Sequence, residues 1–378
     1  MRPKTGLPKR RALRSKPIFK YGFRDNPATD SHLNQTLKGV GSPNAIPVVS
    51  LFAGCGGMDL GFLGGFKFLG DLYAPLPYRI LDAIDIDRFS VETYRFNIGD
   101  HARVGDLTVI APEELPPCRV LIGGFPCQDF SSSGPKVGLA GSRGQLYQAL
   151  VGYMKVYQPE IVVAENVPHL QRLHGGKYLK TILTDFESCG YTFDVWELYG
   201  PDYGLPQSRR RLFLVGTRND INARPICPTP THRHRYVSID EAIGDLVSIT
   251  DETVTNQSQY FVATKATAGG GQGDHTNRRG EPGYCIRANA KARIQFHYEL
   301  DRRLTVRECA RLQSFPDEFV FPFAAMTNMT QIGNAVPPLL AHKVASAISD
   351  FLTRPNDARV AARVPQQSEL FSTSLVRA

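Results

Sequence analysis

The stretch "PVVSLFAGCGGMDLGF", residues 47–62, decides the fold class. Its apolar start predicts a short buried strand, and the residues after Gly57 have the apolar pattern of a helix. The glycines between them, Gly54, Gly56 and Gly57, let the backbone turn tightly and approach a ligand closely. A strand, a glycine turn and a helix in this order indicate a Rossmann-type nucleotide site, and a tight turn without a ligand is the ordinary alternative.

The same alternation continues along the chain. Four further apolar runs of strand length predict buried strands, with helical patterns between them. Strands that alternate with helices predict a largely parallel sheet covered on both faces, with ligands bound outside the carboxyl ends of the strands. The strands are "YRILDAID" (78–85), "RVLIGG" (119–124), "EIVVAEN" (160–166) and "RLFLVGT" (211–217), and the helices cover residues 90–96 and 145–157.

The alternation stops near Arg218. Residues 218–300 are richer in Thr, Gly, Pro, Arg and His, which fits either an insertion or a small, separately folded module. Helical character returns at residues 306–313 and after Pro337–Pro338. We therefore expect a flexible basic arm over residues 1–45, a main domain over 46–217, the second module over 218–300, a return to the main domain over 301–353 and a disordered tail over 354–378.

The positive charge of the chain is concentrated in its first residues. Residues 1–24 hold nine Lys and Arg and no acid, which leaves 44 − 9 = 35 basic against 36 acidic residues in the remainder. Such an arm is either a solvated tail or a segment that contacts phosphates, and the charge alone leaves both interpretations open.

Composition excludes several classes of protein. No apolar run approaches the roughly 18 residues that cross a bilayer, and the basic N-terminus lacks the apolar stretch of a signal peptide. The seven cysteines form no CxxC pair, and "HRH" at residues 232–234 has no further ligands at suitable spacing. We expect a cytoplasmic protein without a metal site or a disulfide framework.

Polar side chains follow the predicted strands. Asp85 ends the second strand and could accept hydrogen bonds from ribose hydroxyls, and Asp106 ends a third short strand and could accept from an adenine amino group. Each aspartate alone is more often a helix cap or a turn residue. Together with the glycine turn, they favour a cofactor that contains a nucleoside.

A cysteine and a carboxyl group end two neighbouring strands. Cys127 follows Gly123–Gly124 and Pro126, and "VVAENV" places Glu165 at the next strand end. A lone cysteine is usually a small buried hydrophobe, but one on a Gly/Pro loop at a strand end is better placed to be a nucleophile. The thiol and the carboxyl group could flank one substrate.

Eight motifs in order resemble those of the DNA cytosine-5 methyltransferase family. They run from about Ser50 to Ile348 and leave outside only the arm, residues 218–300 and the tail. They read "SLFAGCGGMDLGF", "AIDIDRFSVETYRFN", "GFPCQDFSSSG", "SRGQLY", "AENV", "PQSRRRLFLVG", "RLTVRECARLQSFPDEF" and "QIGNAVPP".

The resemblance implies a Rossmann-like methyltransferase sheet, a small target-recognition domain over residues 218–300, and S-adenosylmethionine as methyl donor with S-adenosylhomocysteine as product. Ile86 departs from many relatives, which carry an aromatic or bulky side chain against the adenine. The residues implied for the cofactor are Phe52, Gly54, Gly56, Gly57, Asp85, Ile86, Asp106, Leu107, Pro126 and Asn334.

The resemblance also implies the chemistry. Cys127 would add to carbon 6 of cytosine, and Glu165, kept protonated by burial, would hydrogen-bond or protonate N3. Of Arg209 and Arg211, one would donate to the cytosine O2 and the other would organise the site or a phosphate. The base that removes the carbon-5 proton is not identified by the sequence, and a bound water could serve.

The implied partner is double-stranded DNA, from which the target cytosine must be flipped. Residues 131–141 and "SRGQLY" correspond to the family's mobile loop over the DNA. In the recognition module, Cys285–Ile286 stands where relatives often carry Thr–Leu or Thr–Ile. The implied DNA contacts are Gln128, Ser131, Arg143, Gln207, Arg287 and Arg293, with Asn289, Lys291 and Gln295 as further candidates; an ordinary polar strand edge is the alternative for the residues from 287 to 295.

Three other functions compete. The tRNA-methylating branch of the family carries a Cys-Phe-Thr motif that is absent here. A binding protein that lost catalysis would not need Cys127, Glu165, Arg209 and Arg211, and a nicotinamide oxidoreductase would leave the Pro-Cys-Gln motif without a role. We expect a monomeric prokaryotic or phage enzyme that protects host DNA from a cognate restriction endonuclease. The two enzymes would share a function and would not bind each other.

Overall fold

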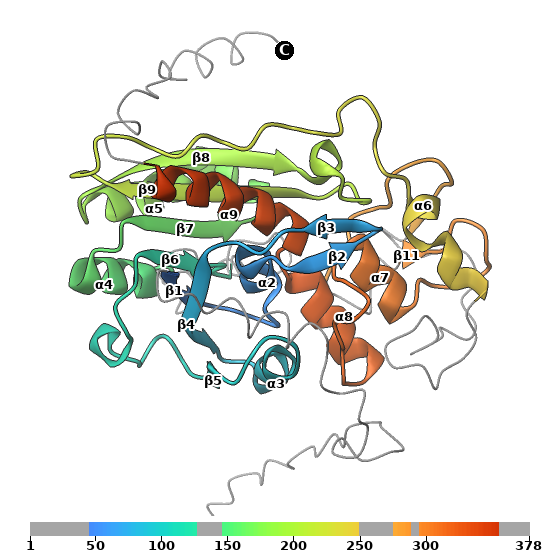
Figure 1. The fold of residues 1–378 in the computed structure, drawn as a ribbon, viewed down its shortest axis with the longest axis horizontal. Helices are drawn as coiled ribbons and strands as arrows, with labels where there is room; N and C mark the ends of the chain where they lie inside the picture. Colours follow the sequence, from blue (N-terminus) through green and yellow to red (C-terminus); the bar gives the residue numbers. More distant parts are fainter. Residues whose placement is uncertain (1–44, 127–145, 249–274, 289–294, 355–378) are drawn as a thin grey trace, which may run out of the picture.

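The computed structural model describes residues 45–126, 146–248, 275–288 and 295–354 of the chain. Its centre is a seven-stranded sheet of order β5-β4-β1-β6-β7-β9-β8 (Figure 1). Five strands are parallel, and β9 and β8 continue the sheet as an antiparallel pair. The strands are β1 (Ile46–Leu51), β4 (Tyr78–Asp85), β5 (Ala102–Val104), β6 (Val120–Gly123), β7 (Ile161–Asn166), β8 (Tyr191–Tyr199) and β9 (Arg210–Arg218).

This sheet confirms the predicted α/β fold. Each strand predicted from an apolar run is present, and so is the short strand before Asp106. The strand β8 was not predicted. In its sequence "YTFDVWELY", buried and exposed side chains alternate along much of the strand. It is an edge strand with one neighbour, β9, and its half-exposed sequence resembles the polar segments around it more than a buried run.

Helices cover both faces of the sheet because the inward side chains alternate along each strand. In β6, Val120 and Ile122 pack into one apolar layer and Leu121 into the other. The first layer contains α2 (Gly57–Leu63), α3 (Arg88–Asn97) and α9 (Pro338–Thr353), and the second contains α4 (Gln148–Tyr157) and α5 (Lys177–Glu187). Figure 1 shows α9 (red) lying across one face of the sheet.

The chain returns to the first layer near its end, where α9 packs closely on α2. A side chain at Gly61 would meet Ala341 Cβ at 2.4 Å and Pro338 O at 2.6 Å, so a glycine is required at this crossing. The remaining elements are the hairpin β2 (Phe66–Phe68) and β3 (Asp71–Tyr73), the pair β10 (His275–Thr276) and β11 (Gln295–Phe296), and the helices α6 (Ile239–Ile243), α7 (Val306–Leu312) and α8 (Ala325–Asn334).

Within residues 218–300, the described parts pack on the main domain. Ile239 and Ile243 of α6 and Ile286 belong to the same apolar cluster as α2, α7 and α9. The expected boundaries at residues 218 and 300 stay a prediction, and the arm, residues 249–274 and the C-terminal tail lie outside the described residues. No helix in the described ranges is long and apolar enough to cross a membrane.

Candidate active site

Five parallel strands end at one edge of the sheet. Because their carboxyl ends point the same way, the residues that follow them gather there. The positions are Phe52 after β1, Asp85 at the end of β4, Asp106 after β5, Pro126 after β6 and Glu165 near the end of β7. Several predicted cofactor residues and Glu165 therefore share one edge.

The glycine turn after β1 is joined directly to Asp85. The backbone N–H of Gly54 donates to Asp85 Oδ2 at 2.8 Å, and the N–H of Asp87 donates to Oδ1 at 2.8 Å. Gly54 has a φ of +56°, and no heavy atom lies within 4 Å of the place where a Cβ would stand. The turn thus leaves open space beside a carboxyl group, which fits a ligand with hydroxyl groups such as a ribose.

The other predicted cofactor residues surround this turn. Asp106 accepts from the N–H and the hydroxyl of Thr108, and these hydrogen bonds lower the pKa of its carboxyl group. Ile86 is 68% exposed, which leaves its side chain available to cover a ring. Phe52 and Leu107 are partly buried against the α4–α5 layer.

The motif "GNAVPP" lies against the same turn. Val336 O would stand 2.4 Å from a Cβ at Gly57, so the two backbones touch only because residue 57 is a glycine. Asn334, at the end of α8, is exposed. The end of the chain's last motif is thereby brought to its first, 279 positions earlier (336 − 57).

Glu165 is buried beside an arginine. Its Oε1 lies 2.8 Å from Nε of Arg211, and its Oε2 would be 3.3 Å from a Cβ at Gly124. Burial raises the pKa of the Glu165 carboxyl group, and the positive charges of Arg211 and Arg209 only partly offset this effect. A carboxyl group in this setting can hold a proton at a pH at which an exposed glutamate has lost it.

The backbone before Cys127 is attached to the strand that carries Glu165. The side-chain amide of Asn166 donates to Phe125 O at 3.0 Å. Cys127 itself lies outside the described residues, as do Gln128, Ser131, Arg143 and Arg293. The described chain reaches Pro126, one residue before the predicted nucleophile.

Arg209 and Arg211 are both buried, but they hold different partners. Its guanidinium group donates to Ile286 O at 2.7 Å, and to Gly333 O and Ala335 O at 2.9 Å each, with Cys285 Sγ at 3.6 Å. Three carbonyl groups from two distant segments are thereby held by one side chain. The structure pairs Arg211, not Arg209, with Glu165.

Gln207 is fully buried in the same junction. Its amide nitrogen donates to Leu312 O and Gln313 Oε1, and its oxygen accepts from the N–H of Ile286. The side chain was expected at the DNA, but its polar atoms bond to protein groups inside the fold. The sequence carries no signal for this position, because a polar Gln before a strand is typical of a surface turn.

Arg287 is exposed, and the irregular segment that carries it passes close to α8. A Cβ at Gly333 would stand 2.2 Å from Ala288 N, so this crossing also requires a glycine. Thr330 of α8 donates to Ala288 O at 3.2 Å. The segment that carries Arg287 is therefore fixed against α8, while the Arg287 side chain reaches solvent.

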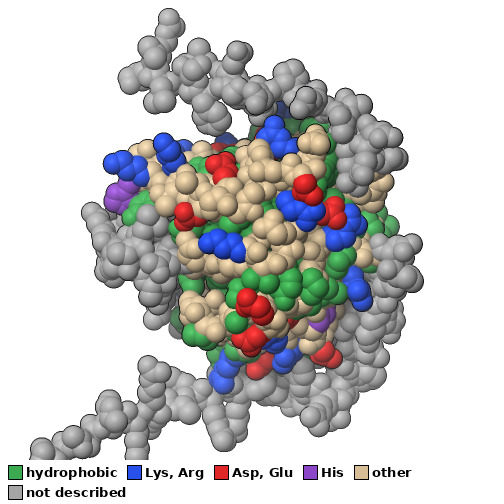
Figure 2. Space-filling model, turned by 90° about the vertical axis from the view of Figure 1, so that its left-hand side faces the viewer, with side chains coloured by type: hydrophobic (Ala, Val, Ile, Leu, Met, Phe, Trp, Pro, Cys, Tyr) green, Lys and Arg blue, Asp and Glu red, His purple; other side chains and the backbone are tan. Residues whose placement is uncertain are grey.

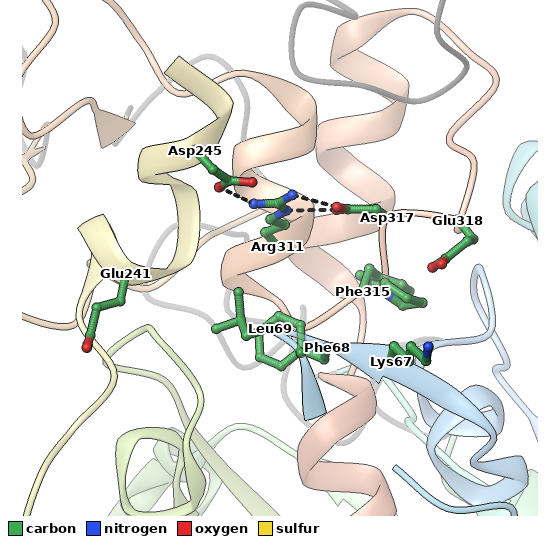
Figure 3. Close-up of a pocket in the computed structure, with 11 residues that line it drawn as sticks. Lys67, Phe68, Leu69, Glu241, Asp245, Arg311, Phe315, Asp317 and Glu318 are labelled. Atoms are coloured by element: carbon green, nitrogen blue, oxygen red, sulfur yellow. Dashed lines mark hydrogen bonds and ion pairs between the residues drawn. The ribbon is translucent and has the colours of Figure 1, made fainter. Parts of the chain in front are cut away.

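A cavity of about 430 Å³ opens away from this edge, between the β2–β3 hairpin and α7. Figure 3 shows Arg311 at its wall, between the carboxyl groups of Asp245 and Asp317, with distances of 2.5 Å to each. Because its cation is already paired with two acids, the cavity offers no basic group from Arg311 to a phosphate.

The surface carries both signs of charge, and the His, Cys, Asp and Glu side chains are the chain's possible metal ligands. On the face drawn in Figure 2, Lys and Arg are interspersed with Asp and Glu, as expected for a near-neutral body. Among the residues that the structure describes, no group of three or more His, Cys, Asp or Glu side chains could hold a metal ion.

Comparison with known proteins decides the family. The model described as C-5 cytosine-specific DNA methylase matches residues 46–350. The chain belongs to this family. The methylase is 34% identical over 344 residues to the Type II methyltransferase M.NgoFVII of Neisseria gonorrhoeae, which covers 81% of the chain and 87% of that relative. It is 32% identical over 355 residues to M.BspRI of Lysinibacillus sphaericus, which covers 80% and 81%.

Solved structures share the fold. The methylase superposes with a TM-score of 0.58 and 17% identity on the Dnmt2 methyltransferase of S. pombe, with 82% of this chain and all of that chain covered. The Entamoeba histolytica methyltransferase EhMeth gives a TM-score of 0.60 at 15% identity, with 82% and 99% covered. Family membership makes the protein a DNA cytosine-5 methyltransferase, and such enzymes take the methyl group from S-adenosylmethionine.

Proposed function

We propose that this methylase flips a cytosine out of duplex DNA and methylates its carbon 5 by covalent catalysis from Cys127. The observation that carries the proposal is the buried Glu165, which lies against Arg211 and beside Gly124, three residues before Cys127. An acid, a cation and the backbone leading to a nucleophile converge there on one edge.

The residues divide the reaction between them. The Cys127 thiolate forms a bond to carbon 6. The electron pair of the C5–C6 double bond moves to the C4–C5 bond, and that of the C4–N3 double bond moves to N3. Glu165 donates its proton toward N3, so negative charge does not build up on the base. Arg211 holds Glu165 in place and extends toward the cytosine O2. Arg209 fixes the junction behind them.

Carbon 5 would then take the methyl group from the donor, with the S–C bond breaking and S-adenosylhomocysteine leaving with its electron pair. Bound S-adenosylmethionine supplies an electrophilic methyl group, and the glycine turn at Gly54 with Asp85 would hold its ribose. Asp106 and Ile86 would contact the adenine, and Phe52, Gly56, Gly57, Leu107, Pro126 and Asn334 complete the cofactor site. Removal of the carbon-5 proton by a base restores the double bond and expels Cys127 as a thiolate.

The module of residues 218–300 would read the target sequence. Arg287 and Arg293 are the proposed base or phosphate contacts there, with Gln128, Ser131 and Arg143 on the catalytic side. Gln207 forms hydrogen bonds inside the protein. We propose that it holds the segment that carries Arg287 in place through its hydrogen bond with the N–H of Ile286. One catalytic domain and one module suffice for a monomer that acts on one strand at a time.

The relatives named as Type II methyltransferases support a protective role. We propose that the enzyme modifies host DNA against a restriction endonuclease that acts on the same sequence, and that it works in the cytoplasm.

Bisulfite sequencing tests this function. DNA from a host that expresses the methylase should keep unconverted cytosine at one position of one short recurring sequence, and DNA from a host that expresses Cys127→Ser should not. Complete conversion in the presence of folded wild-type protein would contradict the proposal.

A further inference from the structure

The two described ends of the segment that carries Cys127 lie together. Phe125 precedes residues 127–145 and Tyr147 follows them, and their ring centroids are 6.2 Å apart. Both side chains are only 4% exposed. The described residues on either side of this segment therefore meet in one small apolar cluster, which Phe186 of α5 completes with an edge-to-face contact to Tyr147 at 6.0 Å.

A hydrogen bond fixes each end. At the first end, Asn166 Nδ2 donates to Phe125 O at 3.0 Å. At the second, the Tyr147 hydroxyl donates to Asp185 Oδ2 at 2.6 Å, and Gln148 Nε2 donates to the same oxygen at 3.0 Å. Burial raises the pKa of Tyr147 to about 12, so its hydroxyl stays a donor at neutral pH.

The bond to Asp185 is of the stronger kind. A hydroxyl that donates to a carboxylate at this length makes a charge-assisted bond, about twice as strong as a neutral one. Asp185 stands on α5 and lies in none of the eight family motifs. No role in the reaction described above requires it.

We propose that Asp185 is a positioning residue for the nucleophile. By holding the Tyr147 ring against Phe125, it sets the backbone that leads through Pro126 to Cys127. A reacting atom displaced by about 1 Å can cost up to about 10²-fold in rate, so a loosened anchor weakens the chemical step. This inference rests on the proposed function, because it matters only if Cys127 attacks the base.

A purely structural tie between α4 and α5 is the competing explanation. It would make loss of the bond visible in thermal stability and leave the rate of attack by Cys127 unchanged. The two explanations therefore differ in the rate at which the enzyme forms its covalent bond to DNA.

The experiment measures single-turnover adduct formation with a duplex that carries 5-fluorocytosine at the target, in the presence of saturating S-adenosylmethionine. Asp185→Ala and Tyr147→Phe should each slow adduct formation roughly tenfold. The double variant should be no slower than either single one, since both remove the same bond. Asp185→Asn keeps an acceptor oxygen and should stay within about threefold of wild type.

Tyr157→Phe is the matched control. Tyr157 is the last residue of α4, and Tyr147 stands just before the first. The Tyr157 hydroxyl donates to Glu113 O at 3.2 Å, so its removal leaves the bond between Tyr147 and Asp185 intact. The rate for Tyr157→Phe and the affinity of all variants for S-adenosylmethionine should match those of wild type.

Equal adduct rates in wild type, Asp185→Ala and Tyr147→Phe would overturn the inference, and so would additive losses in the double variant. Tyr147→Phe keeps the ring, so it tests the bond even if Asp185→Ala does not fold. A wild-type enzyme that forms no adduct would contradict the proposed function instead, which keeps the two failures distinct.

Discussion

Glu165 is subject to two opposing influences within one small space. Burial favours the neutral acid, and the guanidinium group of Arg211 at 2.8 Å favours the carboxylate. The pKa is raised, so burial dominates. The family resemblance implied a protonated carboxyl group, but the partner that holds it could not be predicted, because the sequence does not say which of Arg209 and Arg211 lies beside Glu165.

Glu165→Gln should lower turnover by about 10²–10⁴-fold with a smaller effect on DNA affinity, because it removes the proton donor and keeps the size of the side chain. Wild-type activity should fall as pH rises through the raised pKa of Glu165, where the proton is lost. The residual activity of the variant should lack this descending limb.

Turnover and DNA affinity measured across pH check this prediction, with Glu160→Gln as control. Glu160 pairs with Arg119 just before the other end of β7, so its variant should keep both the rate and the pH profile. A Glu165→Gln enzyme within threefold of wild type would make Glu165 a structural residue.

At the scale of elements, the parallel strands were predicted from the sequence, and the edge strand β8 and the helices α5 and α8 were not. The runs that became β1, β6 and β7 are buried on both faces and are largely apolar, whereas β4 also carries the exposed Arg79. By contrast, α5 and α8 mix polar and apolar residues, although the buried Tyr178, Ile182 and Phe186 of α5 recur every four residues, a pattern that predicts an amphipathic helix. The junction of Gln207 and Arg209 could not be predicted, because most of its partners are backbone groups that no side-chain pattern reveals.

A buried carboxyl group joins α2 to its neighbours. Asp59 accepts from the hydroxyls of Ser50 in β1 and Tyr94 in α3, at 3.0 Å each. Burial raises the pKa of Asp59 from 3.8 to about 6. The folded protein therefore holds this proton between pH 4 and 6, where the unfolded chain releases it, and the stability that the group contributes falls as pH rises through that window.

Asp59→Asn should remove this dependence, because an amide stays neutral. Two units of pKa correspond to about 3 kcal/mol, of which roughly 1–2 kcal/mol develops between pH 5 and 7.5. Wild type should lose that amount of unfolding free energy relative to the variant over this interval. Denaturant unfolding at several pH values measures the difference, and two parallel curves would refute the assignment.

At the scale of the whole molecule, the excess positive charge and the proposed recognition of the DNA sequence belong to different parts of the chain. The described body is close to neutral, and the excess of positive charge belongs to residues 1–24, which lie outside the described residues. The arm is either a solvated tail or a phosphate contact, and we expect the module of residues 218–300 to read bases.

Deletion of residues 1–24 should weaken binding to all duplexes about equally and flatten the salt dependence. The slope of log K against log salt should change by about 0.9 for each phosphate that the arm neutralises in the full chain. Arg287→Ala should instead cost about 1–3 kcal/mol at one base pair if it reads a guanine edge. Salt titrations on cognate and scrambled duplexes separate these effects. An unchanged slope would make the arm a solvated tail, and an unchanged cognate-to-scrambled ratio would remove Arg287 from the reading surface.

The central claim is that Cys127 forms a covalent bond to the target cytosine. The direct measurement is the mass of the complex formed with a duplex in which 5-fluorocytosine replaces the target base, with S-adenosylmethionine present. Fluorine cannot leave as a proton, so wild-type enzyme should remain bound in a denaturation-resistant adduct of one protein and one DNA, while Cys127→Ser forms none and still binds the cofactor. An adduct that persists in Cys127→Ser, or a wild-type enzyme that methylates DNA but is never trapped, would contradict the account.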